Sequence, residues 1–280
     1  MYLSIRKKMN TSSIVIYNLH FIEFKPIIDS LNIPEINIVY IVDHSNRVAS
    51  LEKEINDVAG NYPNLEIVYI KHINNGYGGG HNIAIKRAIS AGSKFHLVVN
   101  PDVWFPKETI SGLIQYMNDN PDVGQAMPRI LFPDGSIQRV AKLLPTPVDM
   151  FGRMCLPDFI IRKRNNRFEL TNLDYSKVQD APYLSGCFMF FKLEFLEEIG
   201  LFDERFFMYA EDIDVTRRMH SSHRTVLLPN YIAYHKFNRE SRRSLKLFII
   251  HIINIILYFN KWGWFFDPER NRINKQITNG

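Results

Sequence analysis

The sequence contains little cysteine, and this shortage limits the kinds of protein it can encode. Only two cysteines occur in 280 residues, Cys155 and Cys187, and neither forms a motif with the other or with a histidine. A disulfide framework and a cysteine-based zinc site are therefore not expected, and the composition favours a reducing cytosol. The basic N-terminus is not followed by the apolar stretch of a signal peptide.

The sequence also lacks an uninterrupted apolar run long enough to cross a membrane. Its most apolar stretch, residues 245–259, is interrupted by Lys246, His251 and Asn254. At about 15 residues it is shorter than the roughly 20 that a bilayer requires, so no transmembrane helix is predicted. Residues 241–260 instead predict an amphipathic helix, which either docks on an anionic membrane or packs against the core.

The excess of basic charge is confined to the C-terminus. From Lys236 to Gly280 there are nine Lys or Arg and three Asp or Glu, whereas the rest of the chain is close to neutral. This distribution does not favour a nucleic-acid-binding protein. A basic tail beside an apolar helix instead indicates peripheral contact with anionic lipid.

The first hundred residues alternate between two periodicities. Short runs rich in β-branched and aromatic residues predict four strands, at 14–17, 36–42, 65–70 and 95–99. Between them, apolar residues recur at helical spacing over 20–31, 48–60 and 81–91. Continuous apolar strands that alternate with helices predict an α/β fold whose largely parallel sheet is flanked by helices.

The remainder of the chain is less regular. A helix is predicted over 106–120, and residues 128–182, with recurring prolines and a basic cluster at 162–167, predict an irregular insertion. Beyond the insertion the sequence predicts further elements: a strand at 183–191, helices at 193–199 and 210–220, and strands at 225–228 and 231–235.

Polar residues follow each of the first four predicted strands. They are Asn18, Asp43, the glycine-rich segment Asn74–Asn82, and Asn100-Pro101-Asp102. Parallel strands bring their carboxyl ends to one edge of the sheet, where ligands bind. The glycine-rich segment is predicted to be a loop and matches neither the dinucleotide-binding nor the Walker pattern. Its backbone N–H groups, leading into a helix, are nevertheless suited to a diphosphate.

Asp102 is a candidate metal ligand because it ends an apolar strand. A carboxylate there is suited to Mg²⁺ or Mn²⁺, which retains water and phosphate oxygens as its other ligands. Such an ion neutralises the charge that develops on a departing nucleotide diphosphate. His235 ends the last predicted strand, and a neutral imidazole can complete a metal site there.

Five carboxylates are concentrated around an aromatic patch in residues 202–214. Glu211, Asp212 and Asp214 lie in the first turn of a predicted helix, where acids also simply stabilise the helix dipole. A carboxylate in partly desolvated surroundings has a raised pKa and can act as a general base. Arg218 lies on the same helix face as Glu211, either to bind phosphate or to neutralise the acids.

Taken together, these segments resemble family 2 glycosyltransferases, in particular the rhamnosyltransferase-like branch. The matching segments run in order from about residue 14 to 235: Ile14–Asn18, the Asp43 turn, Asn74–Asn82, Val98–Val103, Ser185–Met189, Gly200–Asp214 with Arg218, and Pro229–His235.

The resemblance implies a GT-A fold and inverting, metal-dependent sugar transfer. It implies a nucleotide-sugar-binding half at 13–127 and an acceptor-binding half at 128–240, followed by the basic tail at 241–280. By position, Asp212 would be the general base with Glu211 beside it, and Asp102 and His235 would hold Mg²⁺ or Mn²⁺. The donor-binding residues would be Tyr17, Asn18, Asp43, Asn74, Gly79, Gly80, Asn82, Asn100 and Arg218.

The sequence departs from the family pattern at the metal motif, where Asn100 replaces the first aspartate of Asp-x-Asp, so the site is expected to be weaker or less metal-dependent. The Gln-x-x-Arg-Trp signature of processive synthases is absent, which favours transfer of a single sugar to a lipid-linked acceptor in bacterial surface polysaccharide synthesis. The expected donor is dTDP-rhamnose, with UDP-linked hexoses left open. The expected location is the cytoplasmic face of the cell membrane.

Two other functions are weighed against this one. A sugar-phosphate nucleotidyltransferase usually has a Gly-rich, basic loop after its first strand, whereas here Asn18-Leu19-His20 follows. An inactive nucleotide-sugar-binding protein would not need the carboxylate cluster. Release of nucleoside diphosphate in an activity assay separates these alternatives.

Overall fold

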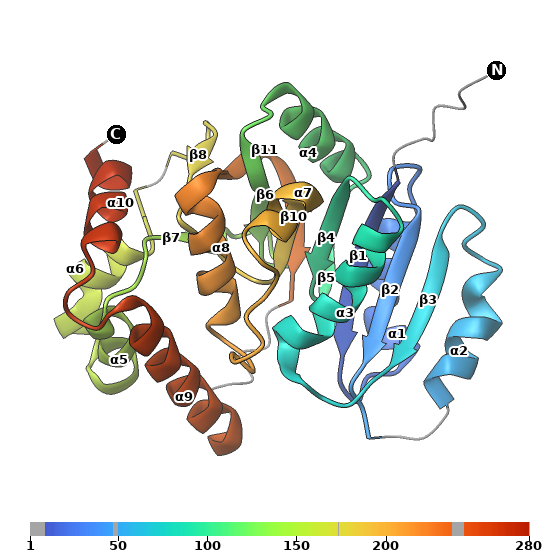
Figure 1. Cartoon of the computed structure of the whole chain (residues 1–280), viewed down its shortest axis with the longest axis horizontal. Helices are drawn as coiled ribbons and strands as arrows, with labels where there is room; N and C mark the ends of the chain where they lie inside the picture. The colour runs from blue at the N-terminus through green and yellow to red at the C-terminus, as the bar shows by residue number, and fades with distance from the viewer. Residues whose placement is uncertain (1–8, 47–49, 173, 237–243, 280) are drawn as a thin grey trace.

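A nine-stranded mixed sheet forms the centre of the molecule (Figure 1). The structure is a computed structural model that describes residues 9–46, 50–172, 174–236 and 244–279. The strand order is β3-β2-β1-β4-β10-β6-β11-β5, and β8 pairs with β11 beside this path. The sheet continues through both predicted halves of the chain.

The first half confirms the predicted alternation of strands and helices. β1 pairs in parallel with β2 and β4, and β2 pairs in parallel with β3. Residues 47–49, at the start of the second predicted helix, lie outside the described residues. The elements are β1 (Asn10–Ile16), α1 (Phe21–Leu31), β2 (Ile38–Asp43), α2 (Ser50–Ala59), β3 (Glu66–Lys71), α3 (Gly76–Ser90) and β4 (Phe95–Val99).

The second half adds antiparallel pairs to the sheet. β10 runs antiparallel to β4 and β6, β6 runs parallel to β11, and β5 runs antiparallel to β11. The strands are β5 (Val103–Trp104), β6 (Val123–Leu131), β7 (Ala141–Lys142), β8 (Gln179–Asp180), β9 (Tyr183–Leu184), β10 (Phe188–Lys192) and β11 (Arg224–His235). The helices are α4 (Glu108–Asp119), α5 (Pro147–Cys155), α6 (Asp158–Phe168), α7 (Leu193–Glu198), α8 (Glu211–Ser222), α9 (Leu245–Trp262) and α10 (Pro268–Asn279).

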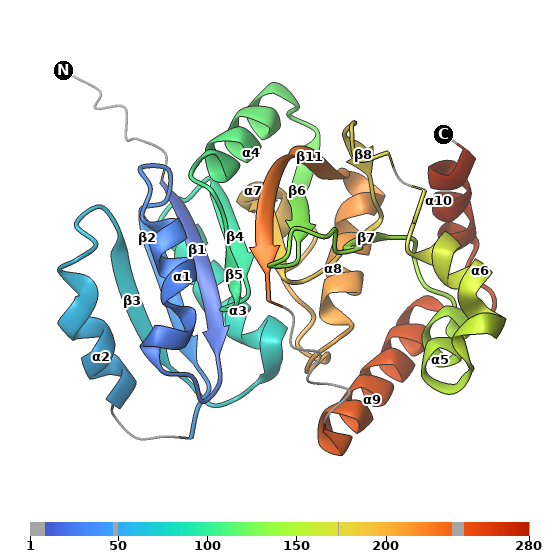
Figure 2. The ribbon, with the colours of Figure 1, turned by 180° about the vertical axis from the view of Figure 1, so that it is seen from behind.

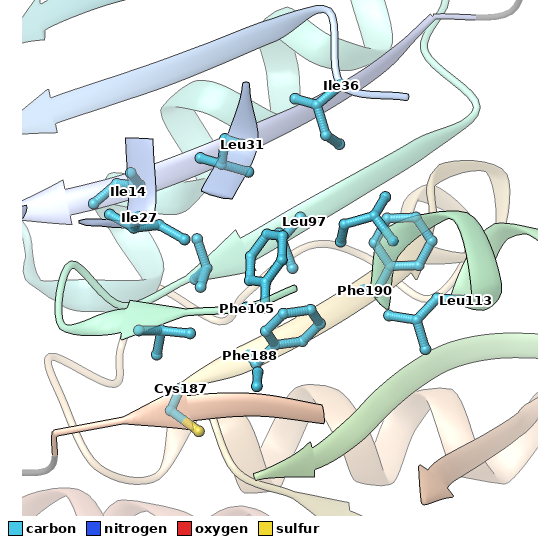
Figure 3. Packing of buried hydrophobic residues seen from close by; sticks show 14 of the residues in the cluster. Ile14, Ile27, Leu31, Ile36, Leu97, Phe105, Leu113, Cys187, Phe188 and Phe190 are labelled. Atoms are coloured by element: carbon cyan, nitrogen blue, oxygen red, sulfur yellow. The ribbon is translucent and has the colours of Figure 1, made fainter. Parts of the chain in front are cut away.

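Apolar side chains on both faces of the sheet are buried, as the continuous apolar strands predict. Leu97 and Phe188 face the cluster that contains the buried sides of α1 and α4, whereas Val98 and Met189 face α3, α7 and α8. Figure 3 shows the first of these clusters, in which the rings of Phe105 and Phe188 meet edge to face at 5.7 Å. The two covered faces hold the strand ends, and therefore the polar edge, in place.

The predicted irregular insertion at 128–182 is wrong in two respects. Residues up to Leu131 belong to β6, and α5 and α6 form a helical hairpin. The proline in β6 is accommodated near an irregularity in the pairing with β11, and Thr146 begins α5 with a capping box. The apolar pattern of the sequence does not predict α6, because this helix is rich in charged residues and buries only Ile161 and Phe168 among its described side chains.

Two predicted strand boundaries also need correction. The strand expected at 183–191 is divided into β9 and β10 by a turn at Ser185–Cys187, and the two strands expected at 225–235 form the single strand β11. Both changes matter for function, because the turn before β10 and the end of β11 lie at the polar edge of the sheet.

The C-terminal helices pack against the body of the molecule. α5, α6, α9 and α10 gather at one end of it (Figures 1 and 2), around an apolar cluster that includes Phe168, Ile213 and Phe259. Arg217 of α8 is almost fully buried and pairs with Asp267 at 2.8 Å, which ties the segment before α10 to α8. Residues 241–243 of the predicted amphipathic helix lie outside the described residues.

One described helix, α9, is long and apolar enough to cross a membrane when judged by length and composition alone. The expected stretch of about 15 residues is thus extended to the 18 residues of α9. One side of α9 is buried through Asn254, Ile255, Tyr258 and Phe259, whereas Ile249 and Ile253 on the other side are about half exposed.

Candidate active site

The predicted polar rim forms one edge of the sheet. β1 to β4 are parallel, β11 runs in the same direction, and β10 begins where these strands end. Their terminal residues therefore share an edge, which is where α/β proteins bind ligands. Across the sheet the edge carries Lys71, Asp43, Tyr17, Asn100, Cys187 and His235.

Asp102 and His235 are neighbours although 133 positions separate them in the sequence. β5 begins directly after Asp102 and pairs antiparallel with the end of β11, so that Val103 lies opposite His235. This pairing leaves the Nε2 atom of His235 3.3 Å from the Oδ1 atom of Asp102. The juxtaposition follows from the pairing of only two residues in β5, which no periodicity in the sequence reveals.

Gln138 fixes the orientation of the His235 ring. Its Nε2 donates to the backbone oxygen of His235 at 2.6 Å, so its Oε1 is left to accept from Nδ1 of the ring at 3.0 Å. Nε2 of the ring therefore faces Asp102. A partner that fixes the second nitrogen in this way is typical of metal-binding histidines. Gln138 lies in the predicted insertion, and the sequence does not point to it.

The donor set of this pair is consistent with a divalent cation. A carboxylate oxygen 3.3 Å from an imidazole nitrogen suits neighbouring ligands of one octahedral ion, which at ~2.1 Å from the metal lie about 3 Å apart. Among the described residues, no group of three or more His, Cys, Asp and Glu side chains is arranged to hold a metal. An ion here would take its remaining ligands from water and from phosphate oxygens.

A proton on Nε2 of His235 competes with a metal ion for that nitrogen. Burial lowers the pKa of His235, but its contacts with Cys187 and Asp102 raise it to about 10. The imidazole is then protonated and paired with Asp102. A metal must displace this proton, so binding is expected to release a proton and to strengthen as the pH rises.

Asp212 is buried at the start of α8 and accepts hydrogen bonds from β9 and from the turn that follows it. Its Oδ2 accepts from the backbone N–H of Gly186 at 2.8 Å and from the hydroxyl of Tyr183 at 3.4 Å. Burial raises the pKa of Asp212, and hydrogen bonds from Gly186 and Ile213 together with the charge of Lys142 only partly oppose this. A carboxylate held in one orientation with a raised pKa has the properties of a general base.

Glu211 shares the buried environment of Asp212 but is directed differently. Its Oε2 accepts from the backbone N–H of Ala210 at 2.9 Å, next to Tyr209, whose φ of 85° is rare for a non-glycine residue. Burial, and then the charge of Asp212, raise the pKa of Glu211 to about 8. At neutral pH Glu211 is therefore largely protonated, which lessens the repulsion between the two acids.

Tyr77 is tied to the turn that holds Asp212. Its hydroxyl donates to the backbone oxygen of Gly186 at 2.6 Å. In the same turn the N–H of Gly186 donates to Asp212, and the carbonyl of Cys187 accepts from the N–H of Asn100 at 3.0 Å. The turn therefore links the start of α8 to the residues that follow β4, and burial raises the pKa of Tyr77. Tyr77 is the only aromatic residue of the glycine-rich segment, which is the signal that could have identified it.

At the other end of the edge, Asp43 is buried and held by polar neighbours. Its carboxylate accepts from the backbone N–H of Ser45 at 2.7 Å, from the hydroxyl of Tyr69 at 2.7 Å and from Lys71 at 3.0 Å. Burial alone would raise the pKa of Asp43, but these contacts lower it. Tyr69 and Lys71, which the sequence did not single out, therefore keep this carboxylate ionised.

Next to Asp43, two buried polar atoms have no hydrogen-bond partner among the described residues: Oδ1 of Asn18 and Nε2 of His44. Asn18 adopts a φ of 55° and its backbone N–H donates to Ser45 at 2.6 Å. Tyr17 is half exposed beside it. This end of the edge therefore combines a fixed carboxylate with unused polar atoms and an accessible aromatic ring.

The glycine-rich segment is not the loop that the sequence predicts, because α3 begins at Gly76. A Cβ on Gly80 would lie 2.7 Å from Val15 of β1 and 2.8 Å from His44, and Gly76 has a φ of 87° and lies against the backbone of Phe207. These glycines let α3 approach the sheet and the 202–207 segment. Gly79 lies in the same turn, against the side chain of Asn75.

Three of the predicted donor-binding residues are engaged by the protein itself. The amide of Asn82 bridges to Phe202 and Glu204, and Oδ1 of Asn74 accepts from the backbone N–H of Gly76 at 3.0 Å. All three nitrogens of the Arg218 guanidinium donate, to Asp214 and to the carbonyls of residues 199–201. The Arg218 contacts hold the end of α7 rather than the polar edge.

Comparison with known proteins identifies the family of the chain. A family model described as "Glycosyltransferase like family 2" matches residues 27–249. Two curated relatives are 27% identical over 179 residues, which is 62% of this chain; both are N-acetylglucosaminyl-diphospho-decaprenol L-rhamnosyltransferases, from two strains of Mycobacterium tuberculosis. The aligned segment spans 58% of the length of these relatives.

Three similar solved structures share the fold at low sequence identity. TarS from S. aureus has a TM-score of 0.59 with 16% identity and covers 97% of this chain and 43% of its own. GalNAc-T7, solved with UDP, GalNAc and Mn²⁺, has a TM-score of 0.59 with 12% identity over 81% of this chain and 43% of its own. The mannosyltransferase PcManGT from Pyrobaculum calidifontis, solved with GDP-Man and Mn²⁺, has a TM-score of 0.56 with 16% identity over 97% and 75%.

The predicted fold and the predicted family are thereby confirmed: a large, mostly parallel sheet flanked by helices is the GT-A arrangement shared with these structures, and this chain also has an apolar C-terminal helix. The family model spans most of the chain, including the ends of β2 and β4, the start of α8 and the end of β11. The chain belongs to the family 2 glycosyltransferases.

Proposed function

We propose that the protein transfers one sugar, with inversion, from a nucleotide-sugar donor to a hydroxyl of a lipid-linked saccharide. The observation that carries the proposal is the turn at Ser185–Cys187. The N–H of Gly186 donates to Asp212 at 2.8 Å, and the carbonyl of Cys187 accepts from the N–H of Asn100 at 3.0 Å, two residues before Asp102. A proton acceptor and a cation-binding pair thus share one edge of the sheet. An inverting displacement needs these two functions at one reaction centre.

In the proposed reaction, Asp212 accepts the proton of the acceptor hydroxyl as its oxygen attacks the anomeric carbon of the donor. The new glycosidic bond forms while the bond from the anomeric carbon to the diphosphate oxygen breaks, and the nucleoside diphosphate leaves with the bonding electrons. Asp102 and His235 would hold Mg²⁺ or Mn²⁺, which offsets the charge on the departing diphosphate. The hydrogen bonds from Gly186 and Tyr183 orient the carboxylate of Asp212.

The proposed donor is dTDP-rhamnose, with its nucleotide at the Asp43 end of the edge. The relatives named as rhamnosyltransferases support rhamnose. The half-exposed ring of Tyr17 and the unpartnered atoms of Asn18 and His44 support a bound base and ribose at this end. Asn100 follows β4 next to β1, between this end and Asp102, where it would border the diphosphate.

Product analysis tests the proposal. The purified protein would be incubated with a lipid-linked N-acetylglucosamine diphosphate and, in turn, dTDP-rhamnose, UDP-glucose and GDP-mannose, with and without Mn²⁺. We expect transfer and release of dTDP with the first donor only, and a strong decrease in chelator. Release of inorganic diphosphate from a nucleoside triphosphate would instead identify a nucleotidyltransferase. Donor binding without any product would identify a binding protein.

We further propose that the protein works on the cytoplasmic face of the membrane and contacts it through α9. Ile249 and Ile253 are about half exposed on one side of this helix, and Phe265 and Phe266 in the following loop are over four-fifths exposed. Exposed apolar and aromatic side chains beside such a helix are typical of helices that rest at a membrane interface. A lipid-linked acceptor would be presented at this surface.

Removing residues 241–280 is a poor test of this idea, because it would uncover the cluster around Phe259 and leave Arg217 without Asp267. The double substitution Phe265→Ser and Phe266→Ser keeps both contacts. We expect it to reduce sedimentation with anionic vesicles at least fivefold, whereas Ile22→Ser, at an equally exposed site on α1, leaves it unchanged. Equal binding of both variants would refute membrane contact at this loop.

A further inference from the structure

Lys142 is a partly buried cation without a direct ion-pair partner in the described part of the chain. It lies in β7, directly opposite Tyr183 of β9, and its side chain is only partly exposed. Its ammonium makes no hydrogen bond or ion pair with the described residues and instead lies over two aromatic rings, 5.3 Å from the centre of Tyr183 and 5.9 Å from that of Phe168. A partly desolvated ammonium is costly unless an anion compensates it.

A second cation lies close to Lys142. The guanidinium of Arg153, from α5, is 5.4 Å from the centre of the same Phe168 ring. Arg153 pairs with Glu169. Burial lowers the pKa of Lys142 and the charge of Arg153 lowers it further, whereas the charges of Glu169 and Asp212 oppose this only in part. Like charges placed together in this way favour binding of an anion.

The position of the two cations relates them to the acceptor rather than to the donor. Tyr183, which underlies Lys142, donates to the carboxylate of Asp212, so that Lys142 lies one tyrosine ring away from the proposed base. On the other side, α5, which carries Arg153, packs against α9 through the rings of Phe151 and Phe259, whose centres are 6.4 Å apart. The pair therefore lies between the base and the apolar helix.

We propose that Lys142 and Arg153 bind the diphosphate of the lipid-linked acceptor. This inference rests on the proposed function, because it assumes that the acceptor hydroxyl reacts at Asp212. A sugar whose hydroxyl faces Asp212 extends its diphosphate away from the base, and its lipid then continues toward the exposed side of α9. The two cations occupy this intermediate position, and their positive charges favour an acceptor with a diphosphate over a neutral glycoside.

The experiment compares two acceptors that differ only in charge. One is N-acetylglucosamine joined through a diphosphate to a short prenyl chain, and the other is the neutral octyl glycoside of the same sugar. For Lys142→Met we expect KM for the diphosphate acceptor to rise at least tenfold, with donor KM and the neutral acceptor changing less than threefold. Lys142→Arg should restore most of the affinity, and Lys163→Met, at an exposed lysine of α6, should behave as the unchanged protein.

Several outcomes would overturn the inference. An equal loss for both acceptors, with a shifted pH profile, would mean that Lys142 acts only by tuning Asp212. An unchanged KM for the diphosphate acceptor would remove Lys142 from the site. If Lys142→Met does not fold, Arg153→Gln is subject to the same comparison and the same criteria.

Direct binding separates this inference from the proposed function. Calorimetric titration of the full chain with the prenyl diphosphate sugar needs no donor and no turnover. Binding that weakens in Lys142→Met but not in Lys163→Met supports the diphosphate site even if no sugar transfer is found. Binding of equal strength in the two variants refutes the site even if transfer is confirmed.

Discussion

Two buried carboxylates of this protein, Asp43 and Asp212, belong to the same sheet edge but have opposite electrostatic surroundings. Asp43 accepts from Tyr69, Lys71 and Ser45, and these contacts lower its pKa in spite of burial. Asp212 accepts mainly from backbone N–H groups, and burial raises its pKa. One is a permanent anion and the other is suited to exchange a proton. Environment thus divides the roles of two identical side chains.

The two ends also differ in how the chain assembles them. The end around Asp43, the proposed donor end, is formed by residues that follow β1, β2 and β3, three neighbouring parallel strands. The end around Asp212, the proposed base end, combines residues from four separate elements. They are Tyr77 of α3, Tyr183 of β9, Gly186 of the following turn and Asp212 of α8. The first end depends on local strand geometry, whereas the second depends on long-range packing.

The largest expected effect comes from exchanging the two carboxylates for amides. Asp212→Asn removes the proton acceptor without changing its shape, so kcat should fall by about 10²–10⁴-fold, with donor KM nearly unchanged. Asp43→Asn should instead raise donor KM about tenfold and leave kcat within about threefold, since a charge-assisted contact is lost far from the proton transfer. Steady-state kinetics on both variants measures this contrast. Similar losses of kcat in both would break the distinction between the two ends.

A somewhat smaller effect is expected at the metal pair. Gln138→Leu frees the ring of His235 but keeps both proposed ligands, and loss of such an orienting partner typically costs 10–100-fold in metal affinity. Half-maximal activation should therefore need ~10–100-fold more Mn²⁺, with the maximal rate largely recovered at saturation. Gln115→Leu, on the surface of α4, serves as a control. An unchanged Mn²⁺ requirement would mean that His235 does not bind the ion.

The contrast between the ends also explains what the sequence could predict. Asp43, Asp102 and His235 stand at the ends of strands with strong apolar patterns, and Asp212 begins a helix in an acidic, aromatic segment. Each could be identified from its own neighbourhood. Their shared edge followed from the expected parallel sheet, and the structure places Asp102 beside His235.

Partners in the second half could not be found in this way. Gln138 reaches His235 because the turn after β6 folds back on that strand, where the N–H of Gln138 donates to Ile130 at 2.9 Å, beside the end of β11. Lys142 meets Tyr183 through two-residue strands. Such short strands leave no period in the sequence. α6 was missed because its stability comes from tertiary contacts of Ile161 and Phe168 rather than from an apolar face. The burial of Arg217 depends likewise on its long-range pairing with Asp267.

A few-fold effect is expected from Lys71→Met at the donor end. The lysine is 44% exposed on its side chain, and its 3.0 Å contact with Asp43 is one of several that keep that carboxylate ionised. Donor KM should rise about two- to fivefold, because an exposed ion pair contributes only ~0.2–1 kcal/mol. The increase should become smaller in 1 M salt, where such pairs are screened. A change in kcat instead of donor KM would contradict a purely donor-side role.

The smallest effect concerns stability and involves Glu211. Burial and the charge of Asp212 raise its pKa to about 8, so the folded state retains a proton that the unfolded chain loses above its usual pKa of ~4.3. The stabilisation is complete below that pH and is lost as the pH rises toward 8. Glu211→Gln cannot ionise and avoids this loss. Its Tm should therefore match the unchanged protein at pH 5 and exceed it by about 2–8 °C at pH 8.5.

Asp203 provides the matched control for that measurement, because its environment lowers its pKa whereas that of Glu211 raises it. Hydrogen bonds from Arg205, opposed by partial burial and reinforced by Lys261, lower its pKa far below the usual value. Its stabilising contribution is present throughout pH 5–8.5, so Asp203→Asn should lower Tm by a similar amount at both ends of this range. If Glu211→Gln also lowered Tm equally at both pH values, Glu211 would be an ionised partner in the fold. The inference that Glu211 is protonated beside Asp212 would then be wrong. The electrostatic contrast drawn between the surroundings of Asp212 and Asp43 would be wrong with it.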